Sequence, residues 1–330
     1  MKNKRIIKLS FKKKQFLKFK FNLGSSETTR EAPLTNKFLT NKRLTNKNYF
    51  NFDSYLKYKP IQIKQLDYHF LEWFIGFVEG DGSFYVKNKN SKDFRLGFDI
   101  GQKDPKVLYW IKKKLGFGTV RSYKKRETNQ IYWCYRVDTK KNIIRLVHLF
   151  NGNFILPKRK VQFNQWLTFC ESWLEPNFKN KQKNIYNGIQ VSLHTAWLAG
   201  FIDAEGCFYA VFSTPSQRSL LSKNLKQKIH ITQKCVYREE KILEQIGKLF
   251  YSKANVSTVS KKSKAFRIEM SSLESHQAMV KYLTKFKLKT KKQIAFLKWS
   301  RVVAAREKNE HLNPKSIIKL ERLCKSINQF

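Results

Sequence analysis

Acidic residues are scarce in this chain. Its 330 residues include 24 Asp and Glu against 67 Lys and Arg, so the formal net charge is +43. A basic surface can serve solubility or a position beside a ribosome. An excess of this size instead favours a polyanionic partner, and nucleic acid is the first candidate.

Metal-binding and nucleophilic cysteine patterns are also absent from the sequence. The five cysteines show no Cys-x-x-Cys pair and no other zinc spacing; they are Cys134, Cys170, Cys207, Cys235 and Cys324. We therefore expect a reducing compartment, with neither a disulfide framework nor a zinc site. The chain contains no Ser/His/Asp catalytic pattern and no glycine-rich phosphate loop.

Long uninterrupted apolar runs are missing too. The longest, Ala196 to Phe212, contains Asp203, Glu205 and two glycines. A membrane span tolerates these residues poorly, so none is predicted. Hydrophobic residues nevertheless make up 41% of the chain and aromatic residues 15%. This composition can bury a core, and the length is typical of about two domains.

A nine-residue motif occurs twice and ends in a carboxylate and a glycine each time. It spans Phe74 to Gly82 (FIGFVEGDG) and Leu198 to Gly206 (LAGFIDAEG), with Asp81 and Glu205 at the eighth position. The flanking aromatic residues match as well, pairing Trp73 with Trp197, Phe84 with Phe208 and Tyr85 with Tyr209. Such a repeat predicts two copies of one domain related by a pseudo-twofold axis, with both carboxylates near that axis.

The hydrophobic periodicity around the two motifs predicts an α+β fold. Each copy has the order helix, two strands, helix, two strands, helix. In the first copy, helical spacing covers 67–80, 107–115, 142–150 and 158–173, and alternation covers 94–101 and 131–137. In the second copy, helical spacing covers 239–250, 274–286 and 291–306, and alternation covers 228–232 and 266–270.

These patterns predict five segments along the chain. A basic, low-complexity extension (1–65) precedes a first repeat (66–173), a linker rich in Lys and Asn (174–190), a second repeat (191–306) and a C-terminal helical tail (307–330). The extension suits a basic tail that adds non-specific DNA affinity. A targeting peptide is the alternative, although Lys outnumbers Arg in this segment.

Small residues lie at the third and seventh positions of each motif. In a helix these positions share one face, where small side chains let two backbones approach closely. The residues concerned are Gly76 and Gly80 in the first copy and Gly200 and Ala204 in the second. We expect the two motif helices to pack there, so that Asp81 and Glu205 emerge side by side at the helix C-terminal ends.

Two neighbouring carboxylates at helix C-terminal ends are electrostatically unfavourable. The arrangement makes sense if hard divalent cations such as Mg²⁺ bind between them and share phosphate oxygens of a substrate. Together with a basic surface, this predicts metal-assisted hydrolysis of phosphodiester bonds. The acids at the sixth position, Glu79 and Asp203, are predicted to be structural or solvated.

The duplicated motif resembles that of the LAGLIDADG homing endonucleases in their two-motif, single-chain form. The resemblance covers roughly residues 66 to 305, and the first copy departs from it by opening with Phe74 in place of Leu. It implies a monomer of two αββαββα halves whose antiparallel sheets form a saddle over duplex DNA. It also implies that Asp81 and Glu205 share about two or three Mg²⁺ ions.

The resemblance suggests two further pairs of catalytic residues. Gln102 and Gln233 end their second strands and are candidates to orient the attacking water, or simply polar strand ends. Lys158 and Lys291 begin their late helices and are candidates to stabilise the scissile phosphates. Each lysine precedes a matched Phe and Trp by five and eight residues, and the alternative is an ordinary phosphate contact or a solvated helix end.

Sequence-specific DNA contacts should come from the strand faces opposite the apolar alternates. The candidates are Lys87, Lys89, Arg95, Asp99, Tyr132 and Arg136 in the first copy, and Lys226, Lys228, His230, Arg267 and Glu269 in the second. An antiparallel ribbon fits the major groove, and two such halves would span roughly 20 base pairs.

The leading hypothesis is therefore an intron-encoded, site-specific DNA endonuclease. The alternative is an RNA maturase of the same fold that binds its group I intron without cutting DNA. A general basic nucleic-acid-binding protein would leave the paired acids unexplained. The abundance of Lys, Asn, Phe and Ile indicates an AT-rich coding genome, which with the resemblance favours a mitochondrion over a plastid.

Overall fold

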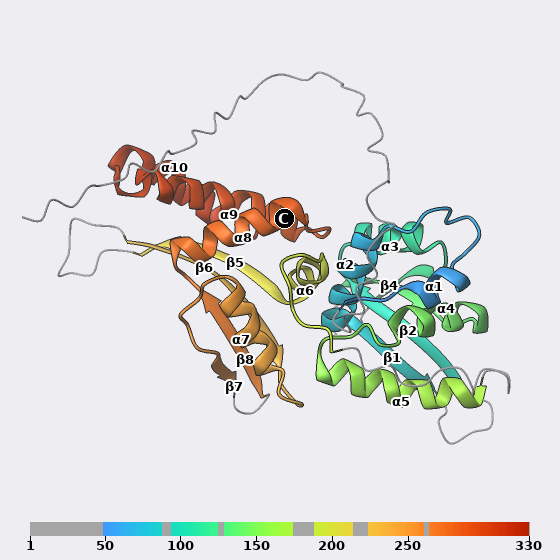
Figure 1. Ribbon diagram of the computed structural model, residues 1–330. Coiled ribbons are helices and arrows are strands. Elements are labelled where there is room, and N and C mark those ends of the chain that lie inside the picture. Colours follow the sequence, from blue (N-terminus) through green and yellow to red (C-terminus); the bar gives the residue numbers. More distant parts are fainter. Residues whose placement is uncertain are drawn as a thin grey trace, which may run out of the picture. The chain divides into compact units, whose positions relative to one another are not determined.

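The computed structural model describes residues 49–87, 94–124, 129–173, 188–213, 224–260 and 264–329. All of these residues belong to one compact unit that begins at Asn46. Within it the chain builds two similar halves, coloured blue to green and yellow to red in Figure 1. Each half contains helices and one antiparallel sheet, as the sequence predicts.

The first half contains one four-stranded sheet with the strand order β1-β2-β4-β3. All three strand pairings in it are antiparallel. Its elements are α1 (Asp53–Tyr58), α2 (Tyr68–Asp81), β1 (Gly82–Lys87), β2 (Arg95–Gln102), α3 (Lys106–Leu115), β3 (Thr119–Lys124), β4 (Ile131–Val137), α4 (Lys140–Phe150) and α5 (Pro157–Trp173).

The second half repeats this topology with the strand order β5-β6-β8-β7. Its elements are α6 (Trp197–Glu205), β5 (Gly206–Phe212), β6 (Leu225–Lys234), α7 (Glu240–Leu249), β7 (Ser257–Ser260), β8 (Ala265–Met270), α8 (Leu273–Lys285) and α9 (Lys292–Glu307), followed by a 3-10 turn (Glu310–Leu312) and α10 (Pro314–Ser326). The matching order confirms the prediction of two αββαββα-type repeats.

Local sequence signals explain where the first motif helix begins and ends. Asp67 caps the N-terminus of α2, because its side chain accepts a hydrogen bond from the backbone N–H of Phe70. Nine residues of α2 are buried, which fits its continuous apolar sequence. At the far end, Gly82 leaves the helix in an extended conformation and begins β1 directly.

The helices α2 and α6 lie side by side between the halves (Figure 1). They pack through their small residues. A Cβ atom added to Gly76 would lie 2.0 Å from the carbonyl oxygen of Trp197, and one added to Gly200 would lie 1.8 Å from that of Trp73. One added to Gly80 would lie 2.2 Å from the Cβ of Ala204. The backbones therefore touch, with no room for larger side chains.

The N-terminal boundary of the fold lies before residue 65, which corrects the predicted extension. Phe52 and Tyr55 are buried in the core of the first half. The Ser54 hydroxyl forms a 2.6 Å hydrogen bond with His148 of α4. The low-complexity sequence that precedes these residues led the predicted extension to include them. Residues 1–48 of that extension lie outside the described residues.

The C-terminal tail is helical, and α10 packs against the second half. The Lys298 ammonium donates to the carbonyl of Ser326, and the Asn328 amide donates to the carbonyl of Phe208 on β5 (2.6 and 2.9 Å). Most of the predicted linker, 174–187, lies outside the described residues. No helix in the described ranges is long and apolar enough to cross a bilayer.

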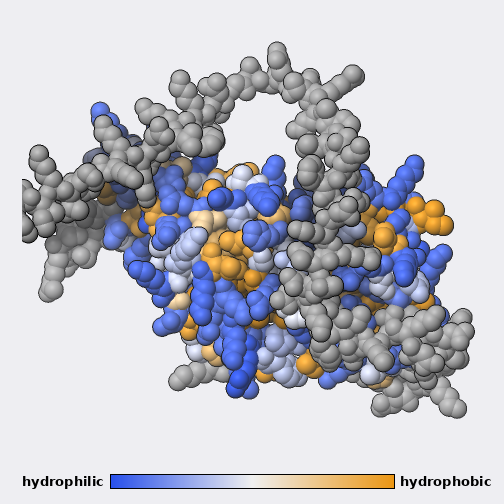
Figure 2. All heavy atoms as spheres, viewed as in Figure 1, coloured by the Kyte–Doolittle hydropathy of each residue, from blue (hydrophilic) through white to orange (hydrophobic). Residues whose placement is uncertain are grey.

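Hydrophilic side chains cover much of the described surface on the face shown in Figure 2, with apolar patches between them. The core contains a large share of the aromatic residues; Trp73, Trp197, Trp299, Phe74, Phe77 and Phe201 are among the largest fully buried side chains. Because several of these residues lie on α2 and α6, the core continues through the contact between the halves.

Candidate active site between the motif helices

The two motif carboxylates lie at the junction of the halves. Asp81 is the last residue of α2, and Glu205 is the last residue of α6. A Cβ atom added to Gly80 would lie 3.4 Å from Oε1 of Glu205, so the second carboxylate reaches across to the end of the first helix. The close approach of the small residues therefore places both acids in one site.

Burial makes this pair of acids unusually basic. It raises the pKa of Asp81 above its ordinary value. Burial, followed by the charge of Asp81, raises the pKa of Glu205 to about 7. The cations of Lys292, Lys158 and Arg159 act in the opposite direction on Glu205 without cancelling these effects. A bound cation would offset the remaining cost of two ionised carboxylates.

The strand-end glutamines differ between the halves. The Gln102 side chain donates a 2.7 Å hydrogen bond to Oδ2 of Asp81 and fixes the orientation of that carboxylate. Gln233 is buried, and its side-chain oxygen accepts the backbone N–H of Lys234 at 2.9 Å. The structure thus joins Gln102 to an acid and gives Gln233 a local backbone partner.

Two basic residues hold the C-terminal ends of the motif helices. The Arg159 guanidinium donates to the carbonyls of Glu79 and Gly80 at the end of α2, each at 2.7 Å. The Lys292 ammonium donates to the carbonyl of Ala204 at the end of α6, also at 2.7 Å. Positive charge at these carbonyls counters the negative ends of both helix dipoles.

From sequence spacing, we predict that the preceding residues, Lys158 and Lys291, are the basic groups near the scissile phosphates. Lys158 lies close enough to Glu205 to lower the pKa of that carboxyl. Lys291 is half-exposed and lies 3.9 Å from the carboxylate of Asp104. Arg159 and Lys292 were missed, although they too are basic at matched positions, four residues before Phe163 and Phe296.

The sixth-position acids are buried structural groups. Glu79 accepts hydrogen bonds from the backbone N–H groups of Ile155 and Leu156, just before α5, and from the Trp197 indole. Asp203 in α6 accepts matching backbone hydrogen bonds from the residues just before α9. Both carboxylates are almost fully buried, with exposures of 0% and 3%. Of the two predicted alternatives, structural and solvated, the structure supports the first.

Two cavities open beside Asp81. The larger has a volume of about 800 Å³ and is lined from both halves by Asp81, Gln102, Lys103, Lys291 and Lys292, among others. The other, of about 480 Å³, reaches the exposed face of the first sheet along Asp99, Tyr123 and Arg136. Asp81 is therefore accessible from a basic cavity and from the sheet surface.

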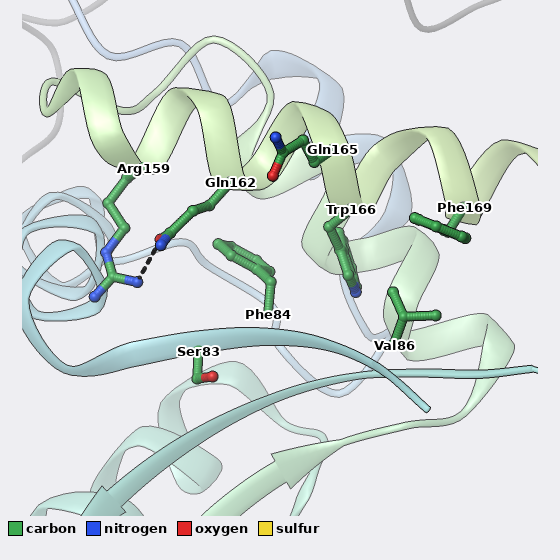
Figure 3. Close-up of a pocket in the computed structure, with 8 residues that line it drawn as sticks. All are labelled: Ser83, Phe84, Val86, Arg159, Gln162, Gln165, Trp166 and Phe169. Atoms are coloured by element: carbon green, nitrogen blue, oxygen red, sulfur yellow. Dashed lines mark hydrogen bonds between the residues drawn. The ribbon is translucent and has the colours of Figure 1, made fainter. Parts of the chain in front are cut away.

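A third, smaller cavity lies between α5 and β1 (Figure 3). Its volume is about 160 Å³. Arg159 lies at one end of it and donates to the side-chain oxygen of Gln162 at 2.9 Å. Trp166 and Phe84 form part of its apolar wall. Arg159 thus lies between this cavity and the end of α2.

The predicted DNA-contacting residues that the structure describes lie on strands, on the side away from the core. Asp99 pairs in register with Arg136, with 3.6 Å between their charged groups. In the second sheet, Glu269 accepts from Lys228 at 2.9 Å and lies 3.4 Å from Arg267. Arg95, Lys226, His230, Tyr132 and Lys87 also keep part of their surface exposed, whereas Lys89 lies outside the described residues.

Asp81 and Glu205 supply the carboxylate oxygens that hard divalent cations prefer, and substrate and water would supply the remaining ligands. The described ranges contain no cluster of three or more His, Cys, Asp or Glu side chains that could enclose a metal. An open pair of carboxylates is therefore the available donor set. The raised pKa values of Asp81 and Glu205 fit such a site, because a cation would stabilise their ionised forms.

The raised pKa of Glu205 predicts a pH-dependent stability in metal-free buffer. The folded protein holds this proton more tightly than the unfolded chain, so stability falls as pH rises from about 4.5 to about 7. Glu205→Gln removes that cost. The variant should be more stable than the original chain by up to about 3 kcal/mol at pH 8 and by much less at pH 5. Urea unfolding at both pH values measures the difference, and equal differences would contradict the prediction.

Sequence comparison connects this geometry to known proteins. The LAGLIDADG endonuclease family model matches residues 74–170 and 198–303. "Probable intron-encoded endonuclease 4" of Neurospora crassa is 32% identical over 78% of this chain, which spans 44% of that relative's length. The "Uncharacterized cox1 intron-2 37.2 kDa protein" of Schizosaccharomyces pombe is 25% identical over 78% of this chain and 72% of that protein.

Solved structures share the fold at low sequence identity. The LAGLIDADG homing endonuclease I-LtrWI, bound to target DNA, has a TM-score of 0.62 and 19% identity and covers 80% of this chain and 99% of its own. The meganuclease I-CpaMI, bound to uncleaved DNA, has a TM-score of 0.62 and 16% identity, with 78% and 99% coverage. Since the family match includes both nonapeptides and most of both halves, this chain belongs to the LAGLIDADG endonuclease family in its two-motif, single-chain form.

Proposed function

We propose that this chain is an intron-encoded endonuclease that cuts both strands of duplex DNA at one long site. The observation that carries the proposal is the meeting of Asp81 and Glu205 at the ends of two closely packed helices. The lysine-lined cavity beside Asp81 supports a substrate rich in phosphate. The proposed target is roughly 20 base pairs, since two sheets with strands of up to about ten residues would span that length.

The chain's own residues would prepare the site in three ways. Asp81 and Glu205 would hold divalent cations, with Mg²⁺ the expected metal, and Gln102 would keep the Asp81 carboxylate oriented through its 2.7 Å hydrogen bond. The lysines lining the large cavity would attract the scissile phosphates. When bound, the metal would activate water and stabilise the leaving oxygen.

Cleavage of an uninterrupted allele tests this proposal. The substrate is the gene that this reading frame interrupts, with the insert removed, incubated with the full chain and Mg²⁺. We expect one double-strand cut at the insertion point, its loss with EDTA, and no cut in the interrupted allele. Absence of cutting across Mg²⁺ and Mn²⁺, or cutting at many unrelated sites, would contradict the assignment.

An RNA maturase is the second candidate, because one relative bears that name. "Intron-encoded RNA maturase bI4" of Saccharomyces cerevisiae is 29% identical over 46% of this chain and 21% of its own length. A pure maturase would bind its group I intron RNA tightly and leave the uninterrupted allele uncut. Filter binding to that intron RNA, beside the cleavage assay, separates the two functions.

We propose a mitochondrial location, since other relatives are named for cox1 introns.

DNA binding should depend steeply on salt. Each phosphate neutralised by Lys or Arg releases counterion, so about ten contacts give a log–log slope of about −9. Removing residues 1–45, which contain many Lys and Arg and only two acids, should flatten the slope and weaken non-specific binding. The cut position should stay the same, because the strand residues carry the base contacts. Affinity measured across a salt series, with cut-site mapping, checks both expectations. A shifted or lost cut site would contradict this division of roles.

A further inference from the structure

Two tryptophans cross the junction between the halves and bind buried acids on the opposite side. The indole N–H of Trp73 on α2 donates to Oδ2 of Asp203 at 2.8 Å. The indole N–H of Trp197 on α6 donates to Oε2 of Glu79 at 2.9 Å. Both indoles are fully buried, so each acid has a fixed donor from the other half.

Each of these acids also fixes the start of the late helix in its own half. Asp203 accepts the backbone N–H of Lys289 at 2.7 Å and the hydroxyl of Thr290 at 2.6 Å, directly before α9. Glu79 accepts the backbone N–H of Leu156 at 3.0 Å, directly before α5. The carboxylates thus join an indole from one half to a helix start from the other.

Each helix start carries a cation that contacts the end of a motif helix. Lys292 begins α9 and donates to the carbonyl of Ala204. Arg159 lies in the first turn of α5 and donates to the carbonyl of Gly80. Both cations lie close enough to Glu205 to act on its carboxyl group. Each tryptophan is therefore connected, through one buried acid and one helix start, to one cation near Asp81 and Glu205.

We propose that Trp73 and Trp197 are positioning residues that act across the junction, Trp73 placing Lys292 and Trp197 placing Arg159, each for the cleavage of one DNA strand. The inference rests on the proposed endonuclease function. A pseudo-twofold axis relates the two contact chains, and a duplex has two scissile phosphates related by a similar axis. Each cation would then serve one phosphate, and each half would depend on the indole of the other half for its own cut.

A purely structural role for the indoles makes a different prediction. Trp73 stacks on Phe77 at a ring distance of 4.8 Å, and Trp197 stacks on Phe201 at 5.1 Å. Loss of packing alone would lower stability and slow both strands together. Loss of the indole hydrogen bond should act through one carboxylate and one helix start, and so slow one strand selectively.

The test is strand-resolved nicking of the target duplex with differently labelled strands. Trp73→Phe and Trp197→Phe remove each indole N–H. Because Phe is smaller, a second pair carries β-(3-benzothienyl)alanine, which keeps the ring shape but has no N–H donor. Trp110→Phe is the matched control, since Trp110 packs 5.2 Å from Trp73 in the same half, and neither Asp81 nor Glu205 lines the cavity beside it.

We expect each benzothienyl variant to slow one strand by about tenfold, the effect of one hydrogen bond to a charged group, with DNA affinity retained. The slowed strand should be opposite for the two positions, and the control should show no bias. Equal slowing of both strands, or the same strand slowed by both variants, would overturn the positioning role while leaving the nuclease assignment intact. If the unmodified chain cuts neither strand, the proposed function itself fails.

Discussion

Asp81→Asn and Glu205→Gln should each abolish double-strand cleavage, with a loss of more than about 10²-fold in rate. Each amide keeps the shape of the side chain but removes the negative charge that would hold a divalent cation. DNA affinity should remain close to that of the original chain, because the basic residues on the strands and around the cavity are unchanged. Cleavage under single-turnover conditions and binding in Ca²⁺ separate the two effects.

Asp104→Asn provides the matched control for these variants. Asp104 lines the same large cavity as Asp81, but its carboxylate pairs with Lys291 at 3.9 Å and lies outside the contact of the motif helices. We expect it to retain most of the cleavage activity. Near-normal cutting by Asp81→Asn or by Glu205→Gln would remove that acid from the catalytic centre.

The second large effect concerns the packing of α2 against α6. Gly200→Leu should unfold or strongly destabilise the chain, by about 1–3 kcal/mol or more, and abolish cleavage. Even the Cβ atom would lie 1.8 Å from the backbone carbonyl oxygen of Trp73, so the helices must separate. Gly76→Leu should behave in the same way, because its Cβ would lie 2.0 Å from the carbonyl oxygen of Trp197. Thermal unfolding measures both.

Gly101→Ala is the control for the glycine variants. Its Cβ would meet only the hydroxyl of Tyr123 at 3.6 Å, an ordinary contact on the exposed face of the first sheet. Its melting temperature should change little. A Gly200→Leu variant as stable as Gly101→Ala would show that the motif helices do not pack through their small residues.

The elements of the fold follow closely from local sequence pattern. The first motif helix was expected over 67–80 and spans Tyr68–Asp81, because Asp67 is its cap and Gly82 its exit. Alternation in the second strands likewise predicts β2 and β6. The interface could also be predicted, since small residues four apart on a helix have few other uses when they recur in a duplicated motif.

The partners of individual polar groups could not be predicted from spacing. Matched spacing pointed to the starts of α5 and α9, but spacing cannot tell which of two neighbouring side chains turns toward the motif helices. In the structure, Arg159 and Lys292 contact the ends of those helices. The indole contacts of Trp73 and Trp197 depend on the packing of one half against the other. Gln102 and Gln233 occupy equivalent strand positions, yet Gln102 bonds to the motif carboxylate of Asp81 and Gln233 bonds to the backbone.

The paired-carboxylate centre is tested most directly by locating the metal. Crystals of the chain with its uncut target DNA, soaked in Mn²⁺, should show anomalous scattering peaks between the carboxylates of Asp81 and Glu205. In crystals of Asp81→Asn, the peak beside residue 81 should be lost while the DNA stays bound. Mn²⁺ found only elsewhere, or unchanged peaks in the variant, would contradict the proposal that these two acids form the metal-binding centre.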